Sequence, residues 1–102
     1  MKLIFVASPL SGDMEENMKY AERACRYVMD AGHAFFAPHL LYTRILDDNC
    51  PEERRMGIDM GLTVLARCDA LWAFGDRISA GMQQEIDAAH KLGIPVYQMG
   101  DL

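Results

Sequence analysis

The residue types best suited to chemistry lie in one short stretch, where Ser79, Gly81 and Glu85 open a helical pattern after an apolar run. Ser79 is a good helix N-cap, because its hydroxyl can accept from a free backbone N–H of the first turn. A helix N-terminus favours anions, and Gly81 leaves room for one. A bound phosphate would repel Glu85, so the carboxylate needs another role. It would serve as nucleophile or general base on a sugar beside the phosphate; the alternative is an ordinary solvated helix carboxylate.

A turn cluster and a histidine are the next candidates. The turn lies between an apolar run and a helical pattern, where backbone N–H groups can hold a phosphate or a sugar. Its candidate binding residues are Ser8, Pro9, Leu10, Ser11 and Gly12. The alternative is an ordinary strand-to-helix turn capped by Asp13. His39 could contact a base or a phosphate, or be a structural loop histidine.

Three further residues depend on where the helices begin. Asp59 reaches the site, as a second catalytic carboxylate, only if its helix effectively begins near Gly57, which together with Gly61 interrupts the helical pattern. Asp76 follows an apolar run and is a candidate acid or sugar-hydroxyl partner. Met82, beside Gly81, could line a base pocket, although methionine more often belongs to the core.

Composition excludes several classes of protein. The chain has 102 residues and a net charge of -5, which argues against a nucleic-acid polymer as partner, because phosphate neutralisation needs a basic face. Three cysteines without CxxC spacing argue against a disulfide framework or a metal site and fit a reducing cytoplasm. No signal peptide or membrane-spanning run is evident. We expect no metal, no cofactor and a cytoplasmic location.

The elements alternate between strand and helix. Apolar runs predict strands at 3–7, 34–37, 70–74 and 94–98, and helical spacing predicts helices at about 13–31, 51–67 and 79–92. This order predicts a single α/β domain over residues 1–102, a small Rossmann-like (flavodoxin-like) three-layer sandwich. The expected strand order is 2-1-3-4, so the loops at 8–13 and 75–79 should face each other at the switch point. The long connection at 38–50 is expected to be functional or interface-forming.

Four segments of the chain resemble the nucleoside 2-deoxyribosyltransferase-like superfamily, which includes 2'-deoxynucleoside 5'-monophosphate N-glycosidases, and above all its short bacterial and phage members. The segments are Phe5-Val6-Ala7-Ser8-Pro9-Leu10-Ser11-Gly12-Asp13, Ala37-Pro38-His39-Leu40, Cys68-Asp69-Ala70-Leu71-Trp72 and Ser79-Ala80-Gly81-Met82-Gln83-Gln84-Glu85. The resemblance implies that Glu85 attacks the anomeric carbon and forms a glycosyl-enzyme ester. It also implies that Ser79 and Gly81 hold a phosphate or sugar, and that Asp59 is the nearest match to an aspartate that assists base departure.

The chain departs from the resembled pattern at two positions: Phe5 stands where the family often has a tyrosine, and Ser11 where the monophosphate hydrolases carry an arginine. Two other functions therefore stay open. One is a non-catalytic module that binds a nucleotide or ADP-ribose-like ligand. The other is a small scaffold that uses residues 38–50 for a protein partner. Under the leading interpretation the partner is a small nucleoside or nucleotide, no membrane is involved, and the chain forms a homodimer or a larger homo-oligomer.

Overall fold

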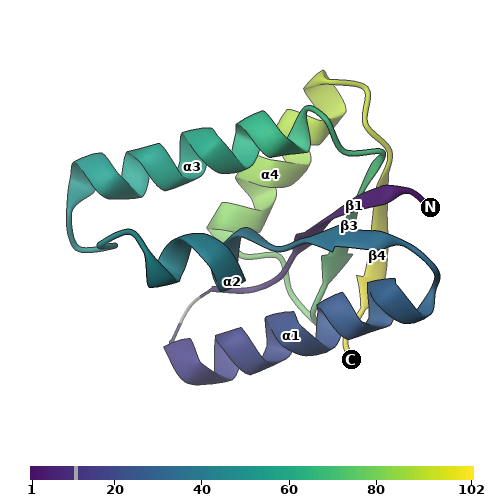
Figure 1. Ribbon diagram of the computed structural model, residues 1–102, viewed down its shortest axis with the longest axis horizontal. Coiled ribbons are helices and arrows are strands. Elements are labelled where there is room, and N and C mark those ends of the chain that lie inside the picture. Colours follow the sequence, from purple (N-terminus) through teal and green to yellow (C-terminus); the bar gives the residue numbers. More distant parts are fainter. Residues whose placement is uncertain (11) are drawn as a thin grey trace.

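A computed structural model describes residues 1–10 and 12–102. The strands are β1 (Leu3–Ala7), β2 (Ala34–Phe36), β3 (Ala70–Phe74) and β4 (Val96–Gly100), and the helices are α1 (Met14–Asp30), α2 (Pro38–Leu41), the 3-10 helix η1 (Tyr42–Arg44), α3 (Pro51–Leu65) and α4 (Ala80–Lys91). Figure 1 shows their arrangement. All strand pairs are parallel, in the order β2-β1-β3-β4. The predicted α/β fold and strand order are confirmed.

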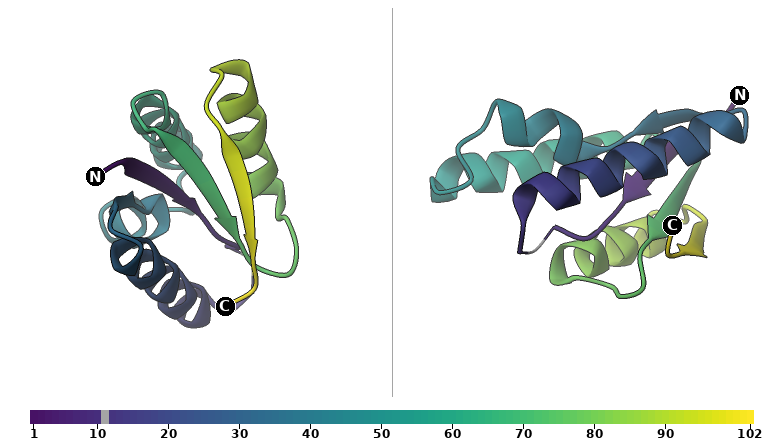
Figure 2. Two further views of the ribbon diagram at one scale, coloured as in Figure 1. Left: turned by 90° about the vertical axis from the view of Figure 1, so that its right-hand side faces the viewer. Right: turned by 90° about the horizontal axis from the view of Figure 1, so that it is seen from below.

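The two faces of the sheet are covered by different helices (Figure 2). Successive strand residues point to opposite faces, so Phe5 and Leu71 pack with Met82 of α4 and with the end of α3. Val6 and Phe74 pack against α1 on the other face. The helices after β1 and β3 therefore lie on opposite faces, which makes the carboxyl ends of these two strands the topological switch point of the sheet.

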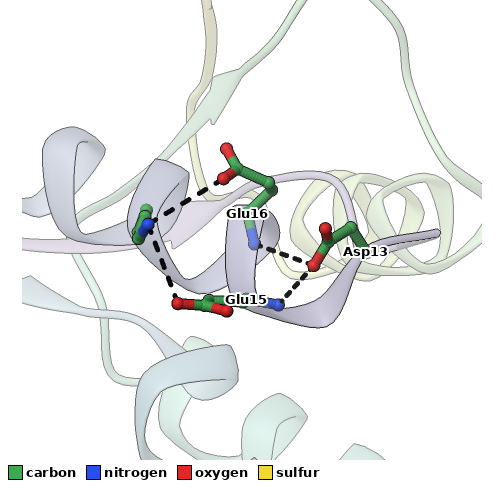
Figure 3. A network of polar contacts seen from close by, with 4 residues as sticks. Asp13, Glu15 and Glu16 are labelled. Atoms are coloured by element: carbon green, nitrogen blue, oxygen red, sulfur yellow. Dashed lines mark hydrogen bonds and ion pairs between the residues drawn. The ribbon is translucent and has the colours of Figure 1, made fainter.

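The longest helix, α1, has 17 residues and begins as predicted at Asp13, whose Oδ1 accepts from the backbone N of Glu15 at 3.0 Å and of Glu16 at 3.3 Å (Figure 3). Lys19, one turn later, forms exposed ion pairs with both glutamates. Two acidic residues in the first turn also stabilise the helix, because their negative charges interact favourably with the positive end of the helix dipole. Among the described residues, no helix is both long enough and apolar enough to cross a membrane.

The structure shows no break in the helix that follows residue 50, although the two glycines left a break near Gly57 possible. Helix α3 runs unbroken from Pro51 to Leu65 through both glycines. A Cβ at Gly57 would lie 3.1 Å from Leu46 Cδ1, and one at Gly61 would lie 4.0 Å from Pro38 Cβ. The glycines therefore allow residues 38–46 to pack closely on α3, and this packing outweighs their low helix propensity.

The connection at 38–50 and the last strand also differ from expectation. The connection contains a short helix and a 3-10 turn, α2 and η1, in place of an extended loop. Strand β4 begins at Val96, two residues later than predicted, because Ile94 N still bonds to Ala89 O at the end of α4. As expected for the last position in the strand order, β4 pairs only with β3 among the described strands.

Candidate functional site

A cavity of about 130 Å³ lies between the start of α4, one face of α3 and residues 38–48. Four of the predicted site residues line it: Leu10, His39, Gly81 and Glu85. The other lining residues are Pro38, Tyr42, Thr43, Leu46, Asp48, Glu53, Arg54, Gly57, Ile58, Gly61, Leu62 and Gln84. The wall is therefore built largely from the segment between β2 and α3, together with the α3 face that carries the two glycines.

Glu85 is the carboxyl that the fold places inside this cavity. The residue is half-buried, and its Oε1 is buried with no hydrogen-bond partner among the described residues. Burial raises the pKa of Glu85 from its usual 4.5 to about 8, because the charged form loses its hydration. The carboxyl is therefore mostly protonated at neutral pH. A buried, unpaired carboxyl oxygen is costly, and such groups are frequent at functional sites.

Helix α4 holds Glu85 in place through the predicted cap. Ser79 Oγ accepts from Met82 N at 3.3 Å, and Ser79 O accepts from Gln83 N at 2.9 Å. Gly81 and Glu85, one turn apart, lie on one helix face and both line the cavity. A Cβ at Gly81 would meet no atom within 4 Å, so the space beside it is open.

The structure places Met82 in the core, which makes the expected base-pocket role wrong. Its side chain is 1% exposed and packs with Phe5 and Ile86. It does not line the cavity, because one step along a helix rotates the side chain by about 100° away from Gly81.

His39 links the cavity wall to the end of β1. Its Nε2 lies 3.0 Å from the carbonyl oxygen of Ser8, which can only accept, so Nε2 donates. Burial lowers the pKa of His39, and the hydrogen bond to Ser8 opposes this in part. The ring is therefore neutral at neutral pH. Thr43 Oγ1 donates to the backbone oxygen of His39 and ties the same segment to η1.

The loops after β1 and β3 contact each other. This contact was predicted, because the strand order places both loops at the switch point of the sheet. A Cβ on Gly75, whose φ is +119°, would lie 3.0 Å from Pro9 Cγ. The Ser8 side chain is buried, with no hydrogen-bond partner for Oγ among the described residues, and does not line the cavity. Gly12 is exposed and also stands apart from the cavity lining, while Ser11 lies outside the described residues.

Both aspartates expected at the site lie outside the cavity. Asp59 is exposed, and its Oδ1 lies 3.6 Å from Arg55 Nε. Because α3 is unbroken, Asp59 points roughly 200° around the helix from Gly57 and Gly61, whose face lines the cavity. Asp76 lines a separate hollow, together with Pro9 of the loop after β1, residues of α1 and of the loop after β3, and Asp101.

The sequence reasoning missed the contribution of α3. Arg54 is the sole lysine or arginine among the described lining residues, and Glu53 and Asp48 add exposed carboxylates. The spacing of four between Gly57 and Gly61 was the available signal, because it marks one smooth helix face. Among the described residues, no group of three or more His, Cys, Asp or Glu side chains could hold a metal ion.

Comparisons with known proteins support the fold and the resemblance. The chain is similar to a 2-deoxyribosyltransferase from the psychrotolerant bacterium Bacillus psychrosaccharolyticus, with a TM-score of 0.78 and 25% identity, over 96% of this chain and 72% of that chain. This likeness supports the superfamily, while membership of its short subgroup stays a prediction. No curated protein matches the chain. The model of one family, the domain of unknown function DUF7768, matches residues 2–99, so the chain belongs to that family.

Proposed function

We propose that the protein cleaves or transfers the N-glycosidic bond of a (deoxy)nucleoside or nucleotide, with Glu85 as the nucleophile. The observation that carries the proposal is the Glu85 carboxyl, which lines a cavity and has a buried oxygen without a partner among the described residues. The similarity of the whole fold to a 2-deoxyribosyltransferase supports the same chemistry.

The reaction proceeds in two displacements. The ionised Glu85 oxygen attacks the anomeric carbon, the C–N bond breaks, and the base leaves with the bonding electron pair. The leaving base takes a proton from solvent. Asp59 has no place in this step, since it stands outside the cavity. Attack on the resulting ester by water gives hydrolysis, and attack by a second base gives transfer.

The raised pKa of Glu85 is consistent with a nucleophile whose reaction partner, the sugar, gains positive charge in the transition state. An oxocarbenium-like transition state places positive charge on the sugar beside the carboxylate. That charge replaces the hydration that burial removes, so the ionised form is stabilised most when the bond breaks. The cavity therefore supplies more stabilisation to the transition state than to the free enzyme.

The size of the cavity limits how the ligand lies. Ligand pockets usually measure ~300–1,000 Å³, so about 130 Å³ encloses one ring of a nucleoside and leaves the rest outside. We place a phosphate or sugar hydroxyl at the start of α4, near Ser79 and Gly81, where a helix N-terminus favours negative charge. The described part of the loop at 8–13 would border the other side of the sugar.

The test is base release from a panel of nucleosides and 5'-monophosphates, followed by chromatography of the freed base. We expect release from at least one compound by the wild-type protein and loss of release in Glu85→Gln. The matched control is Glu22→Gln, which changes an exposed carboxyl on α1 away from the cavity and should release base normally. If the wild-type protein releases no base from any of these compounds, the proposed enzymatic function is refuted.

A second candidate function is a non-catalytic module that binds a nucleotide or ADP-ribose-like ligand. The observation in its favour is Phe5, which is fully buried in the core beneath α4 and offers no hydroxyl near Glu85. Such a module would bind its ligand as well, or better, after Glu85→Ala. Base release by the wild-type protein, measured beside calorimetry on that variant, separates the two functions, because a binding module would hold its ligand without releasing a base.

A further inference from the structure

One hydrogen bond fixes which nitrogen of His39 carries the proton. Nε2 lies 3.0 Å from the Ser8 carbonyl oxygen, which has no proton to give, so Nε2 is the N–H nitrogen. In a neutral imidazole the other nitrogen, Nδ1, then has a free lone pair and can only accept. No hydrogen bond of Nδ1 is found among the described residues, although His39 lines the cavity.

The surroundings keep this imidazole neutral. The titratable and charged groups that share its cavity come from four segments: Tyr42, Asp48, Glu53, Arg54 and Glu85. Arg54 is a cation and Glu85 holds its proton at neutral pH, so neither favours an imidazolium. Asp48 and Glu53 are exposed to solvent, and no ion pair joins His39 to a carboxylate within the described residues. Burial then lowers the pKa of His39.

We propose that His39 is a specificity-determining residue whose Nδ1 accepts a hydrogen bond from an N–H or O–H group of the ligand. This assignment rests on the proposed function, since it concerns the ligand of the same cavity. A phosphate oxygen is also an acceptor and would face the lone pair of Nδ1, so the anionic end of a nucleotide is excluded from this wall. The donor is either an amino group of the base or a hydroxyl of the sugar.

The first test is the tautomer itself, measured by long-range ¹H–¹⁵N NMR of the three histidines in the ligand-free protein at pH 7.5, with His39→Gln used to assign the signal. We expect the Nε2–H tautomer with an unprotonated Nδ1. A ring protonated on Nδ1, in either the neutral or the charged form, overturns the proposal whatever the protein binds or cleaves.

The second test is calorimetry on Glu85→Gln, which prevents turnover during titration. The probes are 2'-deoxyadenosine and 2'-deoxycytidine, each compared with an analogue in which hydrogen replaces the amino group. A second arm compares 2'-deoxyadenosine with its 3'-deoxy analogue. We expect loss of the recognised donor to weaken binding about tenfold in one arm. A base amine is the source if the first arm responds, and a sugar hydroxyl is the source if the second does.

His39→Gln then shows whether this nitrogen is responsible. The glutamine amide can still reach the Ser8 carbonyl, but it offers no acceptor at the Nδ1 position. In the double variant with Glu85→Gln, the discrimination should fall to within about twofold. If the probes bind and neither arm shows a difference in affinity, the role of His39 is refuted and the proposed function is not. The same holds if the difference in affinity persists in His39→Gln. If no probe binds and no base is released, the proposed function fails with it.

Discussion

Replacing Glu85 with glutamine should make the protein more stable, by an amount that grows with pH. The carboxyl is buried, and one oxygen has no hydrogen-bond partner among the described residues. Above the pKa of Glu85, the folded wild-type protein holds a poorly solvated charge, and this charge regains its hydration when the protein unfolds. Glutamine has a similar shape and carries no charge at any pH, so the variant avoids this cost.

The magnitude follows from the pKa. The carboxyl titrates at 4.5 when solvated and at about 8 in the folded protein, which corresponds to about 5 kcal/mol at ~1.36 kcal/mol per pH unit. Between these values the folded state binds more protons than the unfolded state, so wild-type stability falls as pH rises through this window. Above pH 8 the loss is complete. Total stabilities of ~5–15 kcal/mol are typical, so the effect is large.

Urea unfolding at pH 5, 7 and 9 measures this effect, with Trp72, the single tryptophan of the chain, as the fluorescent probe. The free energy of unfolding of Glu85→Gln minus that of the wild type should rise by about 4 kcal/mol between pH 5 and pH 9. Glu22→Gln, at an exposed position on α1, should show no such trend. A rise of less than about 1 kcal/mol would refute the view that the folded protein buries this carboxyl.

Four further predictions concern catalysis, backbone geometry, ligand binding and assembly. If Glu85 is the nucleophile, kcat/KM for base release should rise with pH up to about 8, the pKa of the free enzyme; a fall through the same range would make it a general acid instead. Gly75→Ala should lower stability by about 1–3 kcal/mol in thermal unfolding, because φ is +119° and a Cβ would lie 3.0 Å from Pro9 Cγ. Gly81→Ala, where a Cβ meets no atom within 4 Å, should leave the melting temperature unchanged or raise it while weakening ligand binding. Light scattering should show a homodimer or larger assembly, and a monomer at working concentration would contradict this.

The fold could be predicted because its signals are local. Strands β1 and β3 are short apolar runs, the helices have amphipathic spacing, and their alternation allows few topologies. Asp13 and Ser79 fixed two helix starts through their capping chemistry. The same topology placed the loops after β1 and β3 together, as the contact between Pro9 and Gly75 shows.

The candidate site could be predicted most directly where one helix start determined it. Once Ser79 is identified as the N-cap, the spacing of four residues predicts that Gly81 and Glu85 lie on the same face of α4. The position of Asp59 could not be predicted because its direction depends on whether α3 is broken, and the two glycines left both possibilities open. That helix is continuous because residues 38–46 pack against its glycines, and such a tertiary contact has no local signature.

Burial shifts the pKa values of Glu85 and His39, which both line the cavity, in opposite directions, and each shift favours the uncharged form. It raises the pKa of Glu85 and lowers the pKa of His39. An acid and a base that are each neutral near pH 7 suit an uncharged ring beside them. A positive charge that develops on the ligand would favour ionisation of Glu85. Under the proposed function, these groups would suit a neutral nucleoside ring in the ground state and a sugar cation in the transition state, which is the charge change that cleavage of an N-glycosidic bond requires.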